Sequence, residues 1–158
     1  MRKFFILVSA MIAVTAAYAQ GLRKVYDEQR NPVAQLDSAL AVAKTEGKNV
    51  ICQVGGNWCP WCLKFAAFMS SDDEIKSFVD EHYVYIHVNY RRGMKNPDTM
   101  TVMKRLGNPE RFGFPVMVVL DGAGNRMPTQ DSSFLESGEG YDKKPVMRFF
   151  KCWTPAVY

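Results

Sequence analysis

Two cysteines stand three positions apart in the segment Cys59-Pro60-Trp61-Cys62. Pro60 suits the first turn of a helix, so the pair is expected at a helix start, with both thiols on nearly the same face and close enough to form a disulfide. The positive end of the helix dipole favours a thiolate at Cys59, and the thiolate is the species that attacks a disulfide. Cys62, one turn inside the helix, can then attack a mixed disulfide formed on Cys59. This spacing indicates thiol–disulfide exchange, with Cys59 and Cys62 as the catalytic residues and no metal or organic cofactor.

A cysteine pair of this spacing also occurs in zinc sites, in haem attachment and in structural disulfides. A zinc site would need two further ligands, and the sequence holds no second Cys pair or Cys/His pair at suitable spacing. Covalent c-type haem attachment needs His directly after the second cysteine, where this sequence has Leu63. A purely structural disulfide stays open. The remaining cysteines, Cys52 and Cys152, are expected to be unpaired, and Cys52 is expected to be an inert buried thiol.

Hydrophobic residues recur at helical or strand spacing after residue 31. The helices expected from this pattern, from Pro and Gly boundaries and from a Ser71–Glu74 capping box cover residues 32–46, 60–69, 71–79, 96–106 and 146–153. The expected strands cover residues 49–54, 83–89, 115–120 and, as a short hairpin partner, 126–127; residues 129–142 are expected to be a loop. Strands separated by helices predict an α/β fold, with parallel central strands, helices on both faces of the sheet and an antiparallel edge.

The first nineteen residues have the pattern of a secretory signal peptide. Arg2 and Lys3 precede an uncharged run from Phe4 to Ala17, and Ala17-Tyr18-Ala19 is a typical cleavage site. The run is shorter than the ~20 residues needed to span a bilayer, although an uncleaved anchor is the competing interpretation. The sequence therefore predicts a signal peptide at 1–19 and one exported, soluble, periplasmic domain at 20–158.

Composition and charge narrow the class of protein further. The 158 residues are 47% hydrophobic and 23% charged, a balance typical of one globular domain and not of a disordered or collagen-like chain. The formal charge of +4 falls to +2 without Arg2 and Lys3. Because the basic residues are also spread along the chain, neither a nucleic acid nor a membrane surface is expected as a partner.

The segment Val50–Cys62 resembles the active-site segment of the thioredoxin family, and in particular that of exported bacterial thioredoxin-like proteins with a helix before the first strand. Two motifs carry the resemblance, which spans roughly residues 33–153. One is Trp58-Cys59-x-x-Cys62, and the other is Gly113-Phe114-Pro115 before a hydrophobic strand, which is similar to the family's cis-proline loop.

The resemblance implies a thioredoxin-like fold with a central mixed β-sheet. It also implies that Pro115 is cis and faces the dithiol, that Cys59 is the exposed nucleophile and that Cys62 is the buried resolving thiol. Trp58 and Phe114 would border a groove for an extended substrate peptide, which Pro60, Trp61 and Pro115 would also contact. Trp61 departs from the family's common Gly-Pro between the cysteines, and it could be either a docking surface or a packing residue.

Two positions suggest that proton handling also departs from the family. Many thioredoxins place a buried carboxylate six positions before the first cysteine, and here that position is Gln53, which cannot act as a base. The next central strand carries His87, at about the place where relatives often have Lys. Neutral imidazole is a competent base near pH 7, so His87 could take over this role; the alternative is a hydrogen-bonded core or strand-end histidine.

The function expected from these features is thiol–disulfide exchange with other exported proteins. The resemblance is nearer to the reducing branches of the family, so a reductant is favoured over an oxidant, and a reductant outside the cytosol needs a membrane electron donor. The alternative is a non-catalytic binding or chaperone module in which the Cys59–Cys62 disulfide is only structural.

Overall fold

The computed structural model describes residues 21–155 of the chain. The expected signal peptide, residues 1–19, lies outside the described residues, whereas every residue that the sequence singled out for chemistry lies within them. Over residues 21–155, no helix combines the length and the apolar character that crossing a bilayer requires.

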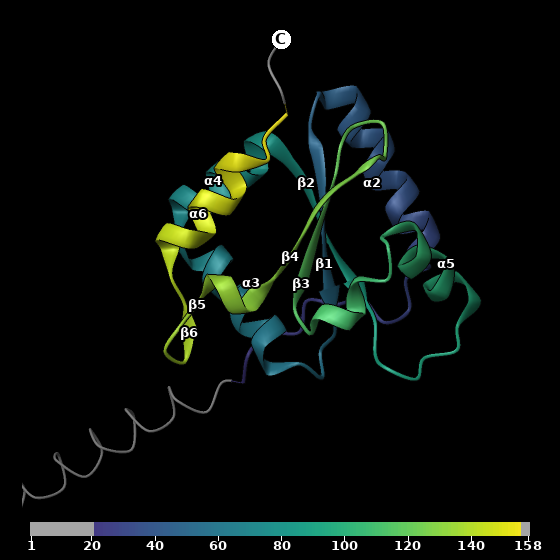
Figure 1. The fold of residues 1–158 in the computed structure, drawn as a ribbon, viewed down its shortest axis with the longest axis horizontal. Helices are drawn as coiled ribbons and strands as arrows, with labels where there is room; N and C mark the ends of the chain where they lie inside the picture. The colour runs from purple at the N-terminus through teal and green to yellow at the C-terminus, as the bar shows by residue number, and fades with distance from the viewer. Residues whose placement is uncertain (1–20, 156–158) are drawn as a thin grey trace, which may run out of the picture.

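Four strands form the central sheet in the order β2-β1-β3-β4 (Figure 1): β1 (Asn49–Gly55), β2 (Tyr83–Asn89), β3 (Val116–Leu120) and β4 (Arg126–Asp131). β1 and β2 run parallel, whereas β3 runs antiparallel to both β1 and β4. The expected mixed sheet is confirmed, but the expectation of parallel central strands is wrong for β3. The chain between β2 and β3 leaves and re-enters the sheet at the same end, so β3 enters in the reverse direction.

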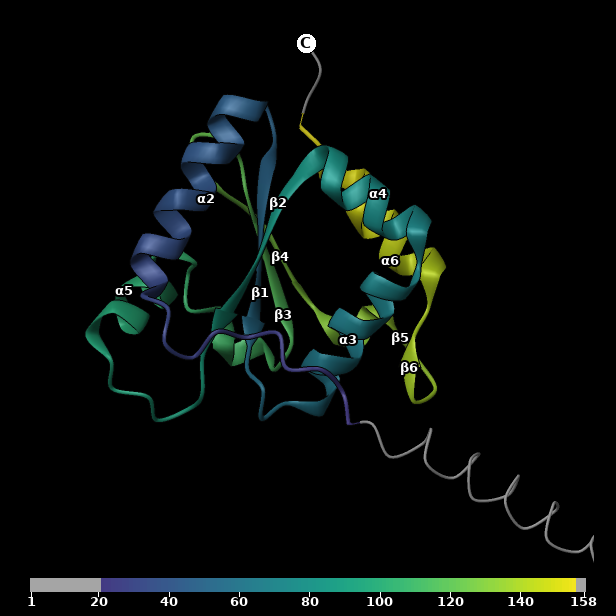
Figure 2. The same ribbon diagram turned by 180° about the vertical axis from the view of Figure 1, so that it is seen from behind.

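Helices cover both faces of the sheet, as expected. α2 (Pro32–Glu46) and α5 (Pro97–Arg105) lie on one face, and the other face carries α3 (Pro60–Ser71), α4 (Asp73–His82) and α6 (Lys143–Cys152) (Figures 1 and 2). Alternate residues of β1 point to opposite faces of the sheet. Val50 and Val54 pack with α2 and α5, whereas Ile51 packs with the other three helices. This burial on both faces explains why β1 is a continuous apolar run in the sequence.

The start of α4 is set by Asp72 and not by the expected Ser71–Glu74 capping box. The Asp72 carboxylate accepts the backbone N–H groups of Glu74 (3.0 Å) and Ile75 (3.1 Å). Ser71 Oγ instead donates to the backbone carbonyl of Phe68 (2.9 Å). Both residue types are good N-caps, but Ser71 is still the last residue of α3, so Asp72 is the first residue with the extended backbone that a cap needs.

Residues 129–142 are not the loop expected from their polar, glycine-containing sequence. Here β4 continues to Asp131, followed by the 3₁₀ helix η2 (Ser132–Leu135) and a small hairpin of β5 (Glu136–Ser137) and β6 (Gly140–Tyr141). Helix α6 also begins at Lys143, earlier than the expected Val146. Because β4 is an edge strand, its backbone pairing with β3 does not require apolar side chains, and a hydrophobic pattern could not reveal it.

Candidate active site

The cysteine pair lies where β1 passes into α3, and the two sulfurs form a disulfide with 5.2 Å between the Cα atoms. Cys59 is the N-cap residue of α3, and its Sγ accepts the backbone N–H of Cys62 (3.1 Å). Pro60 occupies the first turn, as the sequence predicts. In the dithiol form, this N–H and the helix dipole would favour a thiolate at Cys59.

Cys59 is less accessible than expected, whereas Cys62 is buried as expected. Cys59 is only 4% exposed in the disulfide form, and Cys62 is fully buried. The expectation of an exposed nucleophile is therefore wrong for this form, although Cys59 is the more accessible of the two. The reason is a layer of side chains that packs around the pair: Val25, Tyr26, Trp61, Leu63 and Phe114.

The cis-proline loop and the cysteine motif meet beside this disulfide. The Phe114–Pro115 peptide bond is cis, as the resemblance implies. The Phe114 ring contacts Trp58 edge-on, with 5.2 Å between ring centres, and stacks on Tyr90 at 5.8 Å. Trp58 Nε1 donates to the Tyr90 backbone carbonyl (2.9 Å), which holds the indole in place. The two residues expected to border a groove are thus neighbours, on segments far apart in the sequence.

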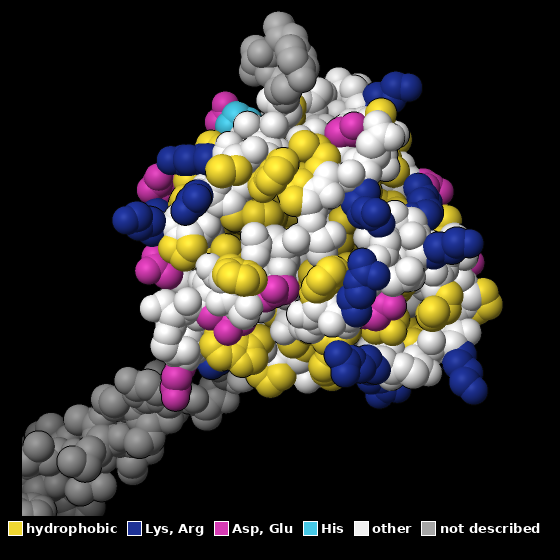
Figure 3. Space-filling view, in the orientation of Figure 1, with side chains coloured by type: hydrophobic (Ala, Val, Ile, Leu, Met, Phe, Trp, Pro, Cys, Tyr) yellow, Lys and Arg dark blue, Asp and Glu magenta, His cyan; other side chains and the backbone are white. Residues whose placement is uncertain are grey.

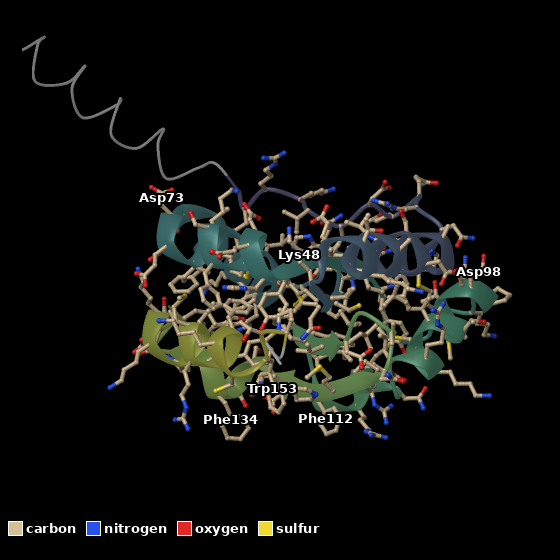
Figure 4. The ribbon with its side chains drawn as sticks, turned by 90° about the horizontal axis from the view of Figure 1, so that it is seen from above. Lys48, Asp73, Asp98, Phe112, Phe134 and Trp153 are labelled. Carbon is tan, nitrogen blue, oxygen red and sulfur yellow. A yellow bond between two sulfur atoms is a disulfide. The ribbon has the colours of Figure 1, made fainter. Side chains whose placement is uncertain are left out.

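Exposed aromatic rings and basic groups surround this contact. Trp58 is 45% exposed and Phe112 is 49% exposed, and Phe112 points away from the fold (Figure 4). The guanidinium groups of Arg92 and Arg111 lie 5.9 Å and 4.9 Å from the ring centres of Phe114 and Phe112 respectively. In the view of Figure 3, hydrophobic side chains gather along the lower edge of the molecule, with basic ones beside them. The exposed Trp58 and the Arg92 guanidinium both lie against Phe114, which packs on the cluster that holds the buried sulfurs.

Trp61 combines packing with partial exposure. Its ring contacts Tyr141 edge-on, with 5.6 Å between ring centres, and the Lys64 ammonium lies 4.8 Å from its ring centre. Tyr141 also donates its hydroxyl to the Trp61 backbone carbonyl (3.1 Å). These contacts give Trp61 a packing role, while its role in docking stays a prediction, as does that of the exposed Pro60.

Gln53, at the position where many thioredoxins have a carboxylate, lies fully buried beneath Cys62. Its Nε2 donates to the Tyr26 hydroxyl (2.7 Å) and to the Cys62 backbone carbonyl (3.1 Å). Its Oε1 accepts the hydroxyl of Tyr85 (2.6 Å). The amide thus joins β1, β2, α3 and the segment before α2 in one hydrogen-bonded chain, without supplying a base.

His87 stands beside Gln53 on the neighbouring strand. Its ring contacts Tyr26 and Tyr85 edge-on, with ring centres 5.2 Å and 5.4 Å away. Burial lowers the pKa of His87 to about 4, and its Nε2 finds no hydrogen-bond partner among residues 21–155. The imidazole is therefore neutral at pH 7. Its role in proton transfer stays a prediction.

The depressed pKa of His87 predicts acid destabilisation. Between about pH 6.5 and 4 the unfolded chain takes up a proton that the folded protein does not. The free energy of unfolding should therefore fall as the pH falls through this window, by at most about 3 kcal/mol. In denaturant unfolding measured at several pH values, His87→Gln should lose this part of the dependence. Identical pH profiles for the two proteins would contradict the prediction.

A family model described as thioredoxin-like matches residues 31–122. That segment is more than half of the chain and contains β1, the cysteine pair and the cis-proline loop. The chain belongs to the thioredoxin-like family. A comparison of this thioredoxin-like protein with curated protein sequences gives no match.

Among the solved structures that resemble this thioredoxin-like protein are a disulphide isomerase and a thioredoxin. A disulphide isomerase from Xylella fastidiosa Temecula1 aligns with a TM-score of 0.71 and 21% identity, covering 83% of this chain and 97% of that one. A thioredoxin from Thermus thermophilus aligns with a TM-score of 0.50 and 21% identity, covering 73% of this chain and 78% of that one. At these identities the likeness establishes the fold, and the expected thioredoxin-like architecture is confirmed.

Sequence reasoning missed the segment before α2, which covers one side of the disulfide in this thioredoxin-like protein. Asn57 Oδ1 accepts the backbone N–H groups of Val25 and Tyr26 (both 3.1 Å), and Asn57 Nδ2 donates to the Tyr26 carbonyl (2.8 Å). These bonds fasten the segment to the loop before Cys59. Tyr26 lies before the segments in which hydrophobic residues recur at helical or strand spacing, so no pattern in the sequence placed it near the cysteines.

The two remaining cysteines are unpaired, as expected. Cys52 is fully buried on β1, and burial raises the pKa of its thiol to about 12. Cys152 is exposed at the end of α6. Cys52 therefore stays protonated at neutral pH, whereas Cys152 is open to solvent.

Proposed function

We propose that this thioredoxin-like protein is a thiol–disulfide oxidoreductase that exchanges disulfides with polypeptide substrates. The observation that carries the proposal is the Cys59–Cys62 disulfide at the start of α3, packed against the cis-proline loop through Phe114. A cysteine that caps a helix is favoured as a thiolate, and a second cysteine one turn later is placed to resolve what the first one forms.

Only the two cysteines and the substrate take part in the exchange, and the bonds and electrons balance between them. In the dithiol form, the Cys59 thiolate attacks a substrate disulfide, breaks its S–S bond and releases one substrate thiolate. Cys62 then attacks Cys59 Sγ in the mixed disulfide, which releases the second substrate thiolate and closes the Cys59–Cys62 disulfide. Two electrons pass from the protein dithiol to the substrate disulfide, and the reverse sequence oxidises a substrate dithiol.

The proposed substrate surface is the edge around the cis-proline loop. The exposed rings of Trp58 and Phe112 supply apolar area for an extended peptide. In this proposal Phe114 and Pro115 flank the reacting sulfurs, while Pro60 and Trp61 contact the substrate from the helix side. The proposed substrate class is exported proteins with accessible disulfides or dithiols.

The compartment and direction are also part of the proposal. The signal-peptide pattern at residues 1–19 supports export to the periplasm, with cleavage before Gln20. The resemblance to reducing branches of the family favours a reductant, which outside the cytosol requires a membrane protein that delivers electrons as a dithiol. The exchange itself involves no nucleic acid.

A redox titration tests the proposal against a structural disulfide. The purified protein is equilibrated in mixtures of reduced and oxidised dithiothreitol or glutathione, and the state of Cys59 and Cys62 is read by thiol alkylation and mass spectrometry. The proposal expects reversible reduction without unfolding, together with catalysed reduction of a model disulfide protein. A pair that is reduced only when the protein unfolds would instead identify a binding or chaperone module.

A further inference from the structure

The Tyr26 hydroxyl and the Cys62 sulfur both lie next to the place that a side chain on Gly55 would occupy. A Cβ placed on Gly55 would lie 2.5 Å from Cys62 Sγ and 2.8 Å from Tyr26 Oη. Gly55 has no side chain to separate them, and Tyr26 belongs to the same buried cluster as both cysteines. The phenol therefore brings a polar group from the segment before α2 close to the resolving sulfur.

Within residues 21–155, the hydrogen bonds around Gln53 leave the phenol proton of Tyr26 without an acceptor. The Cys62 backbone carbonyl can only accept, so the Gln53 nitrogen must face it (3.1 Å). The same nitrogen lies 2.7 Å from Tyr26 Oη, so the tyrosine oxygen accepts this bond. Tyr85 satisfies the other end of the amide by donating to Gln53 Oε1. Among residues 21–155, no hydrogen bond donated by the Tyr26 hydroxyl is found.

The resolving cysteine needs such a donor. Cys62 is fully buried, and burial disfavours the thiolate that must form before it can attack Cys59. The neighbouring Gln53 carries no charge, and burial raises the pKa of Tyr26 well above its ordinary value, so the phenol keeps its proton at neutral pH. The titratable groups that face Tyr26 are His87 and Tyr85 on β2, Tyr141 on β6 and the two cysteines.

We propose that in the mixed-disulfide state Tyr26 donates a hydrogen bond to Cys62 Sγ and thereby stabilises the thiolate that releases the substrate. The inference rests on the proposed exchange function. The Cys62 proton leaves to solvent, Cys62 Sγ bonds to Cys59 Sγ, and the bond from Cys59 to the substrate sulfur breaks. The substrate sulfur departs with the electron pair and takes up a proton from solvent, while Tyr26 keeps its own proton throughout.

Tyr26→Phe tests this role because it removes only the hydroxyl. In the reduced variant we expect the Cys62 pKa, followed by NMR of ¹³C-labelled cysteine, to rise by about one unit, and single-turnover release of a disulfide peptide to slow about tenfold. Formation of the mixed disulfide by Cys59 should be unchanged. Tyr83→Phe is the matched control, since Tyr83 donates its buried hydroxyl to the Phe150 carbonyl at the other end of β2.

An unchanged Cys62 pKa and release rate in folded Tyr26→Phe would overturn the inference. If that variant does not fold, Tyr26→3-fluorotyrosine keeps the shape and makes the phenol more acidic, so the Cys62 pKa should fall and release should speed up. No change in either quantity would again overturn the inference. If the wild-type protein exchanges no disulfides, the proposed function is rejected. If the wild-type protein exchanges disulfides and the Tyr26→Phe variant has the same Cys62 pKa and release rate, only the role of the tyrosine is rejected.

Discussion

A Cys62→Ser variant is expected to hold its substrate on Cys59 as a stable mixed disulfide. Serine leaves the attack by Cys59 possible but removes the thiol that releases the substrate. The adduct should accumulate on non-reducing gel electrophoresis and disappear when dithiothreitol is added. With the wild-type protein it should be too short-lived to accumulate, because Cys62 lies one turn from Cys59 and its Sγ already bonds to Cys59 Sγ in the oxidised form.

The controls for the mixed-disulfide experiment depend on how exposed the other cysteines are. Cys152 is exposed and unpaired, so the experiment belongs in a Cys152→Ser background, whereas the fully buried Cys52 can stay. In the same background, Cys59→Ser should form no adduct, since the remaining Cys62 is fully buried. Equal trapping by the two variants, or trapping by neither, contradicts the assigned roles.

Phe65→Ala is expected to lower the free energy of unfolding by about 3–5 kcal/mol. Phe65 is fully buried in the cluster that packs α3, α4 and α6 on the sheet, and its ring contacts Tyr141 edge-on with 4.7 Å between ring centres. Removing the ring leaves a cavity beneath the helix that carries both cysteines. Denaturant unfolding of the disulfide-bonded protein measures the loss.

Phe134→Ala is the matched control for this substitution. Phe134 is 75% exposed and points away from the fold (Figure 4), so the free energy of unfolding should change by no more than about 0.5 kcal/mol. If the two variants lose similar amounts, the Phe65 ring does not anchor α3 on the sheet.

Local signals in the sequence predicted much of the site. The Cys59–Cys62 pair depends on residues within one turn, and the apolar runs of β1 and β3 follow from burial on both faces of the sheet. The cis bond before Pro115 was implied by a short family motif. The cysteine pair and the two apolar strands depend on neighbouring residues, so the sequence alone was enough to place them, whereas the cis bond was expected only from the family resemblance.

The features that the sequence did not indicate are those that depend on contacts between distant segments of the chain. Tyr26 is fastened beside the disulfide by Asn57, which is 31 positions further along the chain. The low exposure of Cys59 has the same origin, because the side chains around it come from separate segments. The direction of β3 and the length of β4 are likewise properties of strand pairing, which no local hydrophobic pattern encodes.

The family match begins at residue 31, whereas Val25 and Tyr26 lie before it. A domain cut at that boundary would keep both cysteines and the cis-proline, but it would open one side of the disulfide to water and to small dissolved thiols. The sulfurs are therefore shielded partly by the segment that matches the family, which begins at residue 31, and partly by the N-terminal extension that precedes it and carries Val25 and Tyr26. A different extension on the same domain would change how readily a small thiol such as glutathione reaches the pair, with every residue of the Cys-Pro-Trp-Cys motif left as it is.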